Sequence, residues 1–342
     1  MICKGRPLCL PWAAKWSRPY KNTIVTTLKK IQKAWEWRKS YVSKNKLEAF
    51  RLLNGAGDDL EGLQVEYYLG AFQIIYKSAS WFERRKELIQ DLSRISGEID
   101  PSKELRFFEA VNFSPLPTSA TRQKGEGGIW NQVVQEGEFK FEIHLGEGIH
   151  SGLFLDQREN RKTIYFNSKN RRVLNLFSYT GAFTIAAMKG GAKEVVSVDL
   201  SKNYLDWLKR NVDLNHFDVK KTPVWTRDVF EYLKFAEKKN EKFDLIIIDP
   251  PTFSRSARGS FSTEKDMSSL LKQALSLLSE KGNIFFCINT VKISRELFQQ
   301  KVSDVLKDTP YQILKPLSVS RDFKLTASEE KNPYLKACWI GV

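Results

Sequence analysis

Cysteine is scarce in this sequence, and its placement excludes several classes of protein. The 342 residues include four cysteines, Cys3, Cys9, Cys287 and Cys338, and none belongs to a C-x-x-C pair. This scatter argues against a structural zinc site and against a redox dithiol. We therefore expect a cytoplasmic protein without a bound metal.

Long hydrophobic runs and dinucleotide-binding turns are also missing. No apolar stretch reaches the roughly 18 residues that a membrane-spanning helix requires. Charge and proline interrupt the opening residues too often to predict a signal peptide. The sequence has no G-x-G-x-x-G, which argues against NAD as a ligand. We expect no membrane association of the chain as a whole.

Acidic residues are nearly absent from residues 1–46, where twelve Lys or Arg face one acid, Glu36. This segment carries +11 of the net charge of +15, which leaves +4 for the remainder. Its residues 22–46 have the apolar spacing of an amphipathic helix, and aromatic residues alternate with its cations. The pattern predicts a basic arm that contacts single-stranded RNA. A solubilising tail and a helix lying on a membrane surface are the alternatives.

The length predicts two domains after this arm. Residues 47–145 indicate a small α+β domain, with two hairpins around a helix at 81–95 and with RNA docking as one possible role. Residues 146–342 alternate strand and helix, which is typical of a doubly wound α/β sheet. Its expected strands are 173–177, 194–198, 222–225, 243–248, 283–288, 311–319 and 335–340.

Residues 172–201 have the pattern strand, turn, helix, strand. The apolar run 173–177 predicts a buried parallel strand, and Gly181 ends the turn that follows. Asp199 comes at the end of the next strand, about 20 residues beyond the turn. An acid at this spacing can accept hydrogen bonds from both hydroxyls of a ribose, so the unit predicts an adenosyl site. A strand that ends in Asp without any ligand is the alternative.

A second signal lies at residues 243–253. The run 243–248 predicts another buried strand, and Asp249-Pro250-Pro251 follows at its carboxyl end. Two prolines fix the backbone on the rim where Asp199 is also expected. The segment therefore predicts a substrate-binding loop beside the adenosyl site, although a turn stiffened by proline for purely structural reasons is the alternative.

Three ordered motifs carry a family resemblance over about residues 50–342. They are FLDQR at 154–158, NLFSYTG at 175–181 and DPPTF at 249–253. The chain resembles class I S-adenosylmethionine-dependent methyltransferases, and among them the bacterial enzymes that modify large-subunit (23S) ribosomal RNA. The resemblance implies a Rossmann-like sheet whose final strand is antiparallel, S-adenosylmethionine as cofactor and 23S rRNA as partner. It leaves the oligomeric state open.

The resemblance also assigns roles to residues. It implies that Asp199 binds the ribose, that Asp228 contacts the adenine amino group and that residues 154–158 fold over the cofactor. The remaining turn residues would lie near the methionine part, and Arg161 is expected in solvent or facing RNA. The full cofactor set is Phe154, Asp156, Gln157, Arg158, Asn175, Phe177, Tyr179, Gly181, Asp199, Asp228 and Asp249, and the catalytic set is Asp249, Pro250, Phe253 and Asn289.

The target atom depends on a cysteine. Carbon-5 of a pyrimidine becomes nucleophilic only after a thiolate adds to the ring. In the cytosine-specific relatives this cysteine follows the fifth strand, where the present chain has Asn289. Cys287 lies two residues earlier in an apolar run, about 6.6 Å back from the strand end. We expect it to be buried there and too far from the base to react. The resemblance then favours guanine N7 as the target, with 5-methylcytosine formation and a non-catalytic RNA-binding protein as alternatives.

Overall fold

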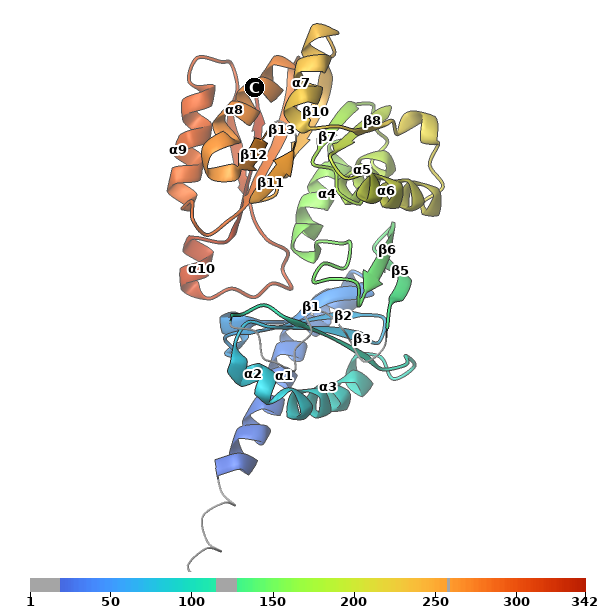
Figure 1. The fold of residues 1–342 in the computed structure, drawn as a ribbon, viewed down its shortest axis with the longest axis vertical. Coiled ribbons are helices and arrows are strands. Elements are labelled where there is room, and N and C mark those ends of the chain that lie inside the picture. The colour runs from blue at the N-terminus through green and yellow to red at the C-terminus, as the bar shows by residue number, and fades with distance from the viewer. Residues whose placement is uncertain (1–18, 115–127, 257–258) are drawn as a thin grey trace, which may run out of the picture.

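The computed structural model describes residues 19–114, 128–256 and 259–342, with the side chains of 19–26 left aside. The chain forms a small N-terminal unit and a larger C-terminal unit, one above the other in Figure 1. Residues 1–18 of the expected arm, with Cys3 and Cys9, lie outside the described residues. Within the described ranges, no helix combines the length and the apolar character that crossing a bilayer requires.

The small unit is a mixed sheet with helices on one face (Figure 1). Within the described residues its order is β1-β2-β3-β4, antiparallel except for the parallel β3–β4 pair. A short 3-10 helix, η1 (Gly55–Asp58), follows β1. The strands and helices are β1 (Ala49–Asn54), β2 (Leu63–Tyr68), β3 (Ala71–Tyr76), β4 (Arg106–Val111), α1 (Pro19–Lys44), α2 (Ala79–Glu83) and α3 (Arg85–Ile99).

Helix α1 covers the expected second half of the arm, but it belongs to the core of the small unit. Ile31, Ala34 and Trp35 are buried in the same apolar cluster as the sheet residues. The Trp35 ring stacks on Phe50 of β1 with 5.7 Å between centroids. The expected division at residue 46 therefore differs from the packing, because one face of the basic helix is apolar and finds its partner on the sheet.

The larger unit is the expected doubly wound sheet. Within the described residues its strand order is β14-β15-β13-β10-β7-β8-β9, and β15 runs antiparallel to both of its neighbours. This confirms the Rossmann-like fold with an antiparallel final strand. The strands are β7 (Arg172–Leu176), β8 (Glu194–Asp199), β9 (Val224–Thr226), β10 (Phe243–Ile248), β13 (Leu278–Asn289), β14 (Gln312–Leu317) and β15 (Leu335–Gly341).

Helices cover both faces of this sheet because side chains alternate along its buried strands. In β10, Leu245 and Ile247 belong to one apolar cluster, and Ile246 and Ile248 belong to the other. One face packs against α4 (Arg158–Phe166), α5 (Ala182–Lys189) and α6 (Lys202–Leu214), and the other against α7 (Val229–Lys238), α8 (Thr263–Ser276) and α9 (Arg295–Leu306). Shorter elements are η2 (Leu155–Gln157), η3 (Val219–Lys221), α10 (Ala327–Lys331) and a hairpin of β11 (Phe253–Ser256) and β12 (Gly259–Ser262). The sequence patterns predicted neither α7 nor this hairpin.

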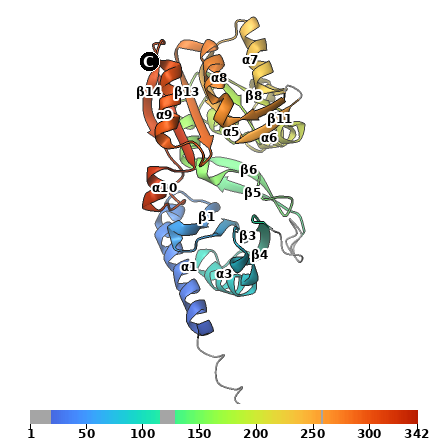
Figure 2. The same ribbon diagram turned by 60° about the vertical axis from the view of Figure 1, so that its left-hand side comes forward.

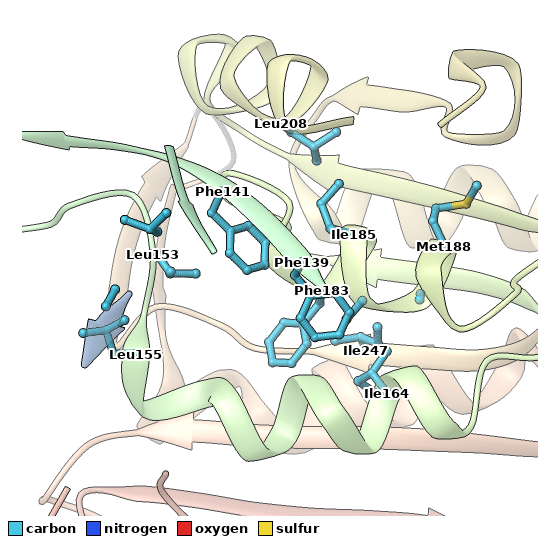
Figure 3. Packing of buried hydrophobic residues seen from close by; sticks show 14 of the residues in the cluster. Phe139, Phe141, Leu153, Leu155, Ile164, Phe183, Ile185, Met188, Leu208 and Ile247 are labelled. Atoms are coloured by element: carbon cyan, nitrogen blue, oxygen red, sulfur yellow. The ribbon is translucent and has the colours of Figure 1, made fainter. Parts of the chain in front are cut away.

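The hairpin of β5 (Trp130–Glu136) and β6 (Phe139–Leu145) joins the two units (Figure 2). Phe139 and Phe141 of β6 pack among Phe183, Ile185 and Leu208 of the larger unit (Figure 3). The backbone N–H of Glu142 also donates to Asn211 Oδ1 at 2.8 Å. The expected division at residue 145 thus places this hairpin with the small unit, whereas its apolar face packs on the larger one.

Candidate functional site

A cavity of about 740 Å³ lies at the carboxyl ends of β7, β8 and β10. Its volume is within the range of small-molecule sites. Its wall brings together most residues that the sequence predicted, although they come from segments 135 residues apart along the chain. The predicted residues that line it are Phe154, Asp156, Gln157, Phe177, Tyr179, Asp199, Asp228, Asp249, Pro250, Phe253 and Asn289.

Asp199 is held in one orientation at the end of β8. Its Oδ2 accepts the backbone N–H of Tyr179 and its Oδ1 accepts that of Ser201, each at 2.9 Å. Burial raises the pKa of this carboxyl. The N-cap of α6 is Ser201 rather than Asp199. The carboxylate therefore keeps its remaining lone pairs for a ligand in the cavity, as ribose binding requires.

The turn between β7 and α5 has an unusual backbone. Phe177 and Tyr179 adopt left-handed conformations, with φ of 57° and 50°, and Gly181 has φ of 83°. Such conformations cost free energy for residues with a Cβ and tend to occur at functional sites. At Gly181 a Cβ would also lie 2.4 Å from Leu208 Cγ. The turn thus brings main chain and the Tyr179 ring to the cavity, where that ring packs on Phe154 at 5.2 Å.

Asp228 ends the turn after β9 and lines the cavity. Its Oδ1 accepts the backbone N–H groups of Phe230 and Glu231, at 3.0 and 3.4 Å, as the N-cap of α7. Cap and ligand contact are compatible because a carboxylate has a second oxygen.

Asp249 lies at the centre of a polar group beneath the rim. Gln157 Nε2 donates to its Oδ2 at 3.1 Å, and the Cys287 thiol donates to its Oδ1 at 2.8 Å. Burial raises the pKa of Asp249 to about 6, although the Cys287 hydrogen bond lowers it. The same burial and the neighbouring Asp249 charge raise the pKa of Cys287 well above the ordinary value for a thiol.

The Cys287 contact was missed in the sequence analysis, which placed this thiol away from the reacting groups. Its burial is confirmed, since none of its surface is exposed. However, β10 and β13 are parallel neighbours with Ile248 opposite Phe286. Continuing that register by one residue places Asp249 beside Cys287. The adjacency of the two strands was the signal that could have predicted this contact.

The rim of the cavity carries the remaining predicted catalytic residues. Pro250 follows Asp249 and lines the cavity, and Phe253 begins the β11–β12 hairpin with 52% of its surface exposed. Asn289 is the exposed last residue of β13, and its carbonyl accepts the Thr252 hydroxyl. A base that reached the cavity would meet the Phe253 ring and the polar side chains of Thr252 and Asn289.

Arg158 and Arg161 do not lie where the sequence predicted. Arg158 is fully buried away from the cavity, where its Nε donates to Glu136 at 2.8 Å and its Nη1 to Asp322 at 2.6 Å. Arg161 is also buried, paired with the same Glu136, and donates to the Phe154 carbonyl at 2.7 Å. Its guanidinium therefore positions the FLDQR segment and reaches the cavity wall instead of lying in solvent.

Asn175 and Gly181, like Arg158, do not line the cavity, whereas Arg161 does. Asn175 Nδ2 donates to Thr184 Oγ1 at 2.9 Å, below the turn, so this amide connects β7 to α5. Gly181 begins α5 as its N-cap, and the next residue, Ala182, contacts the cavity in its place. Both residues shape the turn through the backbone.

Comparisons with known proteins agree with this geometry. Residues 111–310 match the model of a family described as S-adenosylmethionine-dependent methyltransferase. The chain is 33% identical over 312 residues to Bacillus subtilis YwbD, named as a ribosomal RNA large subunit methyltransferase, and covers 78% of it with 90% of its own length. It is 32% identical to ribosomal RNA large subunit methyltransferase I of Aeromonas salmonicida, with the same coverage.

Two further matches extend the comparison. The chain is 37% identical over 211 residues to ribosomal RNA large subunit methyltransferase K of Neisseria meningitidis, which spans 60% of this chain and 55% of that protein. Its fold matches a SAM-dependent methyltransferase from Streptococcus mutans with a TM-score of 0.80, 27% identity and coverage of 93% and 81%. The chain belongs to the S-adenosylmethionine-dependent methyltransferase family, and S-adenosylmethionine is its cofactor.

Proposed function

We propose that this protein transfers the methyl group of S-adenosylmethionine to a base of large-subunit ribosomal RNA. The observation that carries the proposal is the position of Asp249, Pro250 and Phe253 on the wall of the cavity that Asp199 shares. The names of its relatives, YwbD and the type I and type K enzymes, support the same substrate class.

The residues of the site suit methyl transfer without covalent catalysis. The cofactor supplies an electrophilic methyl group, so alignment and exclusion of water provide most of the rate. Asp249 can accept a hydrogen bond from an amino or ring N–H group of the base. Phe253 offers a half-exposed ring on which the base can stack. Asn289 offers an amide at the mouth of the cavity.

We infer that guanine N7 is the target atom. This nitrogen has a free lone pair and needs no nucleophile from the protein. Of the two cysteines in the described residues, Cys338 is buried in β15, and Cys287 is buried with its proton donated to Asp249. A thiol with a raised pKa is a poor nucleophile, because the thiolate is the reactive form.

Formation of 5-methylcytosine is the second candidate, and one contact favours it. The Cys287 sulfur lies 2.8 Å from Asp249, closer to the site than its position in the sequence predicted. A movement of β13 that brought this thiol to the rim would supply the nucleophile that carbon-5 requires.

Mass spectrometry of ribosomal RNA tests both the rRNA substrate and the target atom. Large-subunit RNA from cells with and without the gene should differ by one methyl group on a guanine. Purified enzyme and cofactor should restore that methyl on RNA from the deletion strain. Unchanged RNA would contradict the rRNA substrate, whereas loss of a 5-methylcytosine would support the second candidate.

A further inference from the structure

A second cavity, of about 330 Å³, adjoins the cofactor cavity. The two share His150, Phe154, Asp156, Tyr179 and Asn289 in their walls. The opposite wall of the second cavity comes from the sheet of the small unit. The space therefore lies between the two units and opens beside the residues that would bind the reacting base.

Arg51 of β1 lines this second cavity and has unused hydrogen-bond donors. Its Nη2 donates to Glu66 Oε1 at 2.7 Å, and its guanidinium lies over the Phe323 ring at 4.5 Å. The residue is 7% exposed. Within the described parts of the chain, its Nε and Nη1 have no hydrogen-bond partner. Buried donors without partners are unfavourable, so this arrangement suits a ligand that supplies acceptors.

The charge of the cavity favours a neutral ligand over a phosphate. Arg51 and Lys77 are the cationic residues in its wall, and Glu66 and Asp156 are the acidic ones. Glu66 is tied to Arg51 and to the Tyr68 hydroxyl, and Asp156 Oδ2 accepts the Tyr334 hydroxyl at 3.0 Å. Two carboxyl groups beside the arginine would repel an anion but could accept N–H groups of a base.

An aromatic ring stands between the cavities. Phe154 lines both of them, is 37% exposed and packs against Tyr179 and His150, with ring centroids 5.2 and 5.4 Å from its own. Exposed rings of this kind are platforms on which unstacked bases of a single strand can stack.

We propose that the second cavity binds an unstacked RNA base next to the one that is methylated. Arg51 Nε and Nη1 donate to a carbonyl oxygen of that base, and Phe154 stacks on it. The inference rests on the proposed RNA substrate and extends it, since Arg51 becomes a residue that selects sequence context. Guanine, cytosine and uracil carry a carbonyl acceptor that adenine lacks.

The test begins with the methylated position mapped as above. We then prepare transcripts of that rRNA region. In each transcript, one nucleotide within two positions of the target is changed to adenine or to an abasic site. The full-length protein is assayed for methylation of each transcript. For the wild type, the change at one flanking position should lower kcat/KM at least tenfold. Arg51→Lys should abolish this discrimination while affinity for S-adenosylhomocysteine stays the same. Arg172→Lys is the matched control, since Arg172 also pairs with glutamates but lies at the far end of β7.

The double variant Arg51→Gln/Glu66→Gln protects the test against misfolding, because it removes both charges of the buried pair. Equal discrimination in the wild type and in both variants would overturn the inference. RNA binding by the double variant could also depend less on salt than binding by the wild type, by about 0.7 log unit per log salt. That result would overturn the inference too, because it would identify a contact between Arg51 and a phosphate. If the wild type binds the cofactor but methylates no transcript, the proposed function fails instead.

Discussion

At the scale of single residues, the site depends on carboxylates that the backbone and neighbouring side chains hold in place. Asp199 is fixed by two N–H groups, and Asp249 by an amide and a thiol. Each has a raised pKa because of burial, so each is sensitive to any change in its donors. Because Asp199 and Asp249 have different partners, we expect mutations at the two residues to have different effects.

Asp199→Ala should weaken cofactor binding by about 1–3 kcal/mol, the cost of losing hydrogen bonds to a charged group. Calorimetry with S-adenosylhomocysteine measures the loss. Asp213→Ala, at an exposed acid of α6, should bind like the wild type. If the folded Asp199 variant keeps full affinity, the ribose assignment is wrong.

Methyl transfer should decline as the pH falls through about 6, because Asp249 is then protonated and can no longer accept two donors. Cys287→Ala should keep most activity at pH 8 but move this midpoint upward, since the thiol hydrogen bond lowers the pKa of Asp249. Gln157 and the charges of Asp156 and Arg161 act on Asp249 in both proteins.

Rate–pH profiles measure this shift, with Cys338→Ala as the control at a buried cysteine one strand away. Asp249→Ala should lose most activity and still bind the cofactor. We expect no covalent adduct with a transcript that contains 5-fluorocytosine. If the wild type forms an adduct and Cys287→Ala abolishes it, the target atom is cytosine carbon-5 and not guanine N7.

At the scale of elements, α1 combines a packed apolar face with an exposed cationic face. Its apolar face is part of the core of the small unit, and Arg38 is buried in an ion pair with Asp58 at 2.7 Å. The cations Lys29, Lys33 and Lys39 are exposed on the other face. Deleting residues 1–46 would therefore expose the core, and substitution of the exposed lysines is the better test of RNA contact.

The triple variant Lys29→Gln/Lys33→Gln/Lys39→Gln should flatten the salt dependence of RNA binding by roughly 0.7 log unit per log salt for each lost phosphate contact. Filter binding across a salt series measures the slope, and cofactor affinity should not change. The matched control is Lys234→Gln/Lys238→Gln/Lys239→Gln, in the last turns of α7 and at its C-cap, which removes the same charge from exposed positions. Identical slopes for the two triple variants would show that α1 is not an RNA contact.

At the scale of the whole molecule, a buried ionic network joins the two units. Glu136 at the end of β5 accepts Arg158 and Arg161, and Arg158 also pairs with Asp322. Arg158 Nη2 donates to the Ala49 carbonyl of β1 at 2.7 Å. The backbone N–H of Arg51 donates to Asp322 Oδ2 at 2.8 Å. The network fixes the small unit, and hence the second cavity, against the cofactor site.

Glu136→Gln should lower the free energy of unfolding by about 3–5 kcal/mol, because buried Arg161 loses the carboxylate it pairs with and buried Arg158 keeps only Asp322. Burial alone would raise the pKa of Glu136, but Arg161 and Arg158 outweigh it and lower the pKa. The stabilisation is therefore present above the unfolded pKa, near 4.3, and is lost as the pH falls through the lower folded value.

Denaturant unfolding at pH 7 and in acid measures this effect, and the gap between wild type and variant should narrow in acid. Glu194→Gln is the control, because its pair with Arg172 is one-third exposed and contributes at most about 1 kcal/mol. If Glu136→Gln lowers the free energy of unfolding no more than Glu194→Gln does, the ionic network contributes little to stability.

The sequence by itself determined the α/β class, the strand-end acids Asp199, Asp228 and Asp249, and the motifs of the family. These follow from local patterns, since a buried parallel strand is an apolar run and ligands bind where such strands end. Expected and observed bounds agree for the strand Phe243–Ile248.

Tertiary structure alone decided the contacts between segments far apart in the chain. Arg158 is 22 residues from Glu136 and 164 from Asp322, so no local pattern shows that its charge is buried. Cys287 reaches Asp249 across 38 residues because β10 and β13 happen to be neighbours. Arg51 faces the cofactor segment only because that network fixes the small unit there. Hydrophobic periodicity specifies which face of an element is buried, whereas the partner of a buried polar group depends on how the elements pack together.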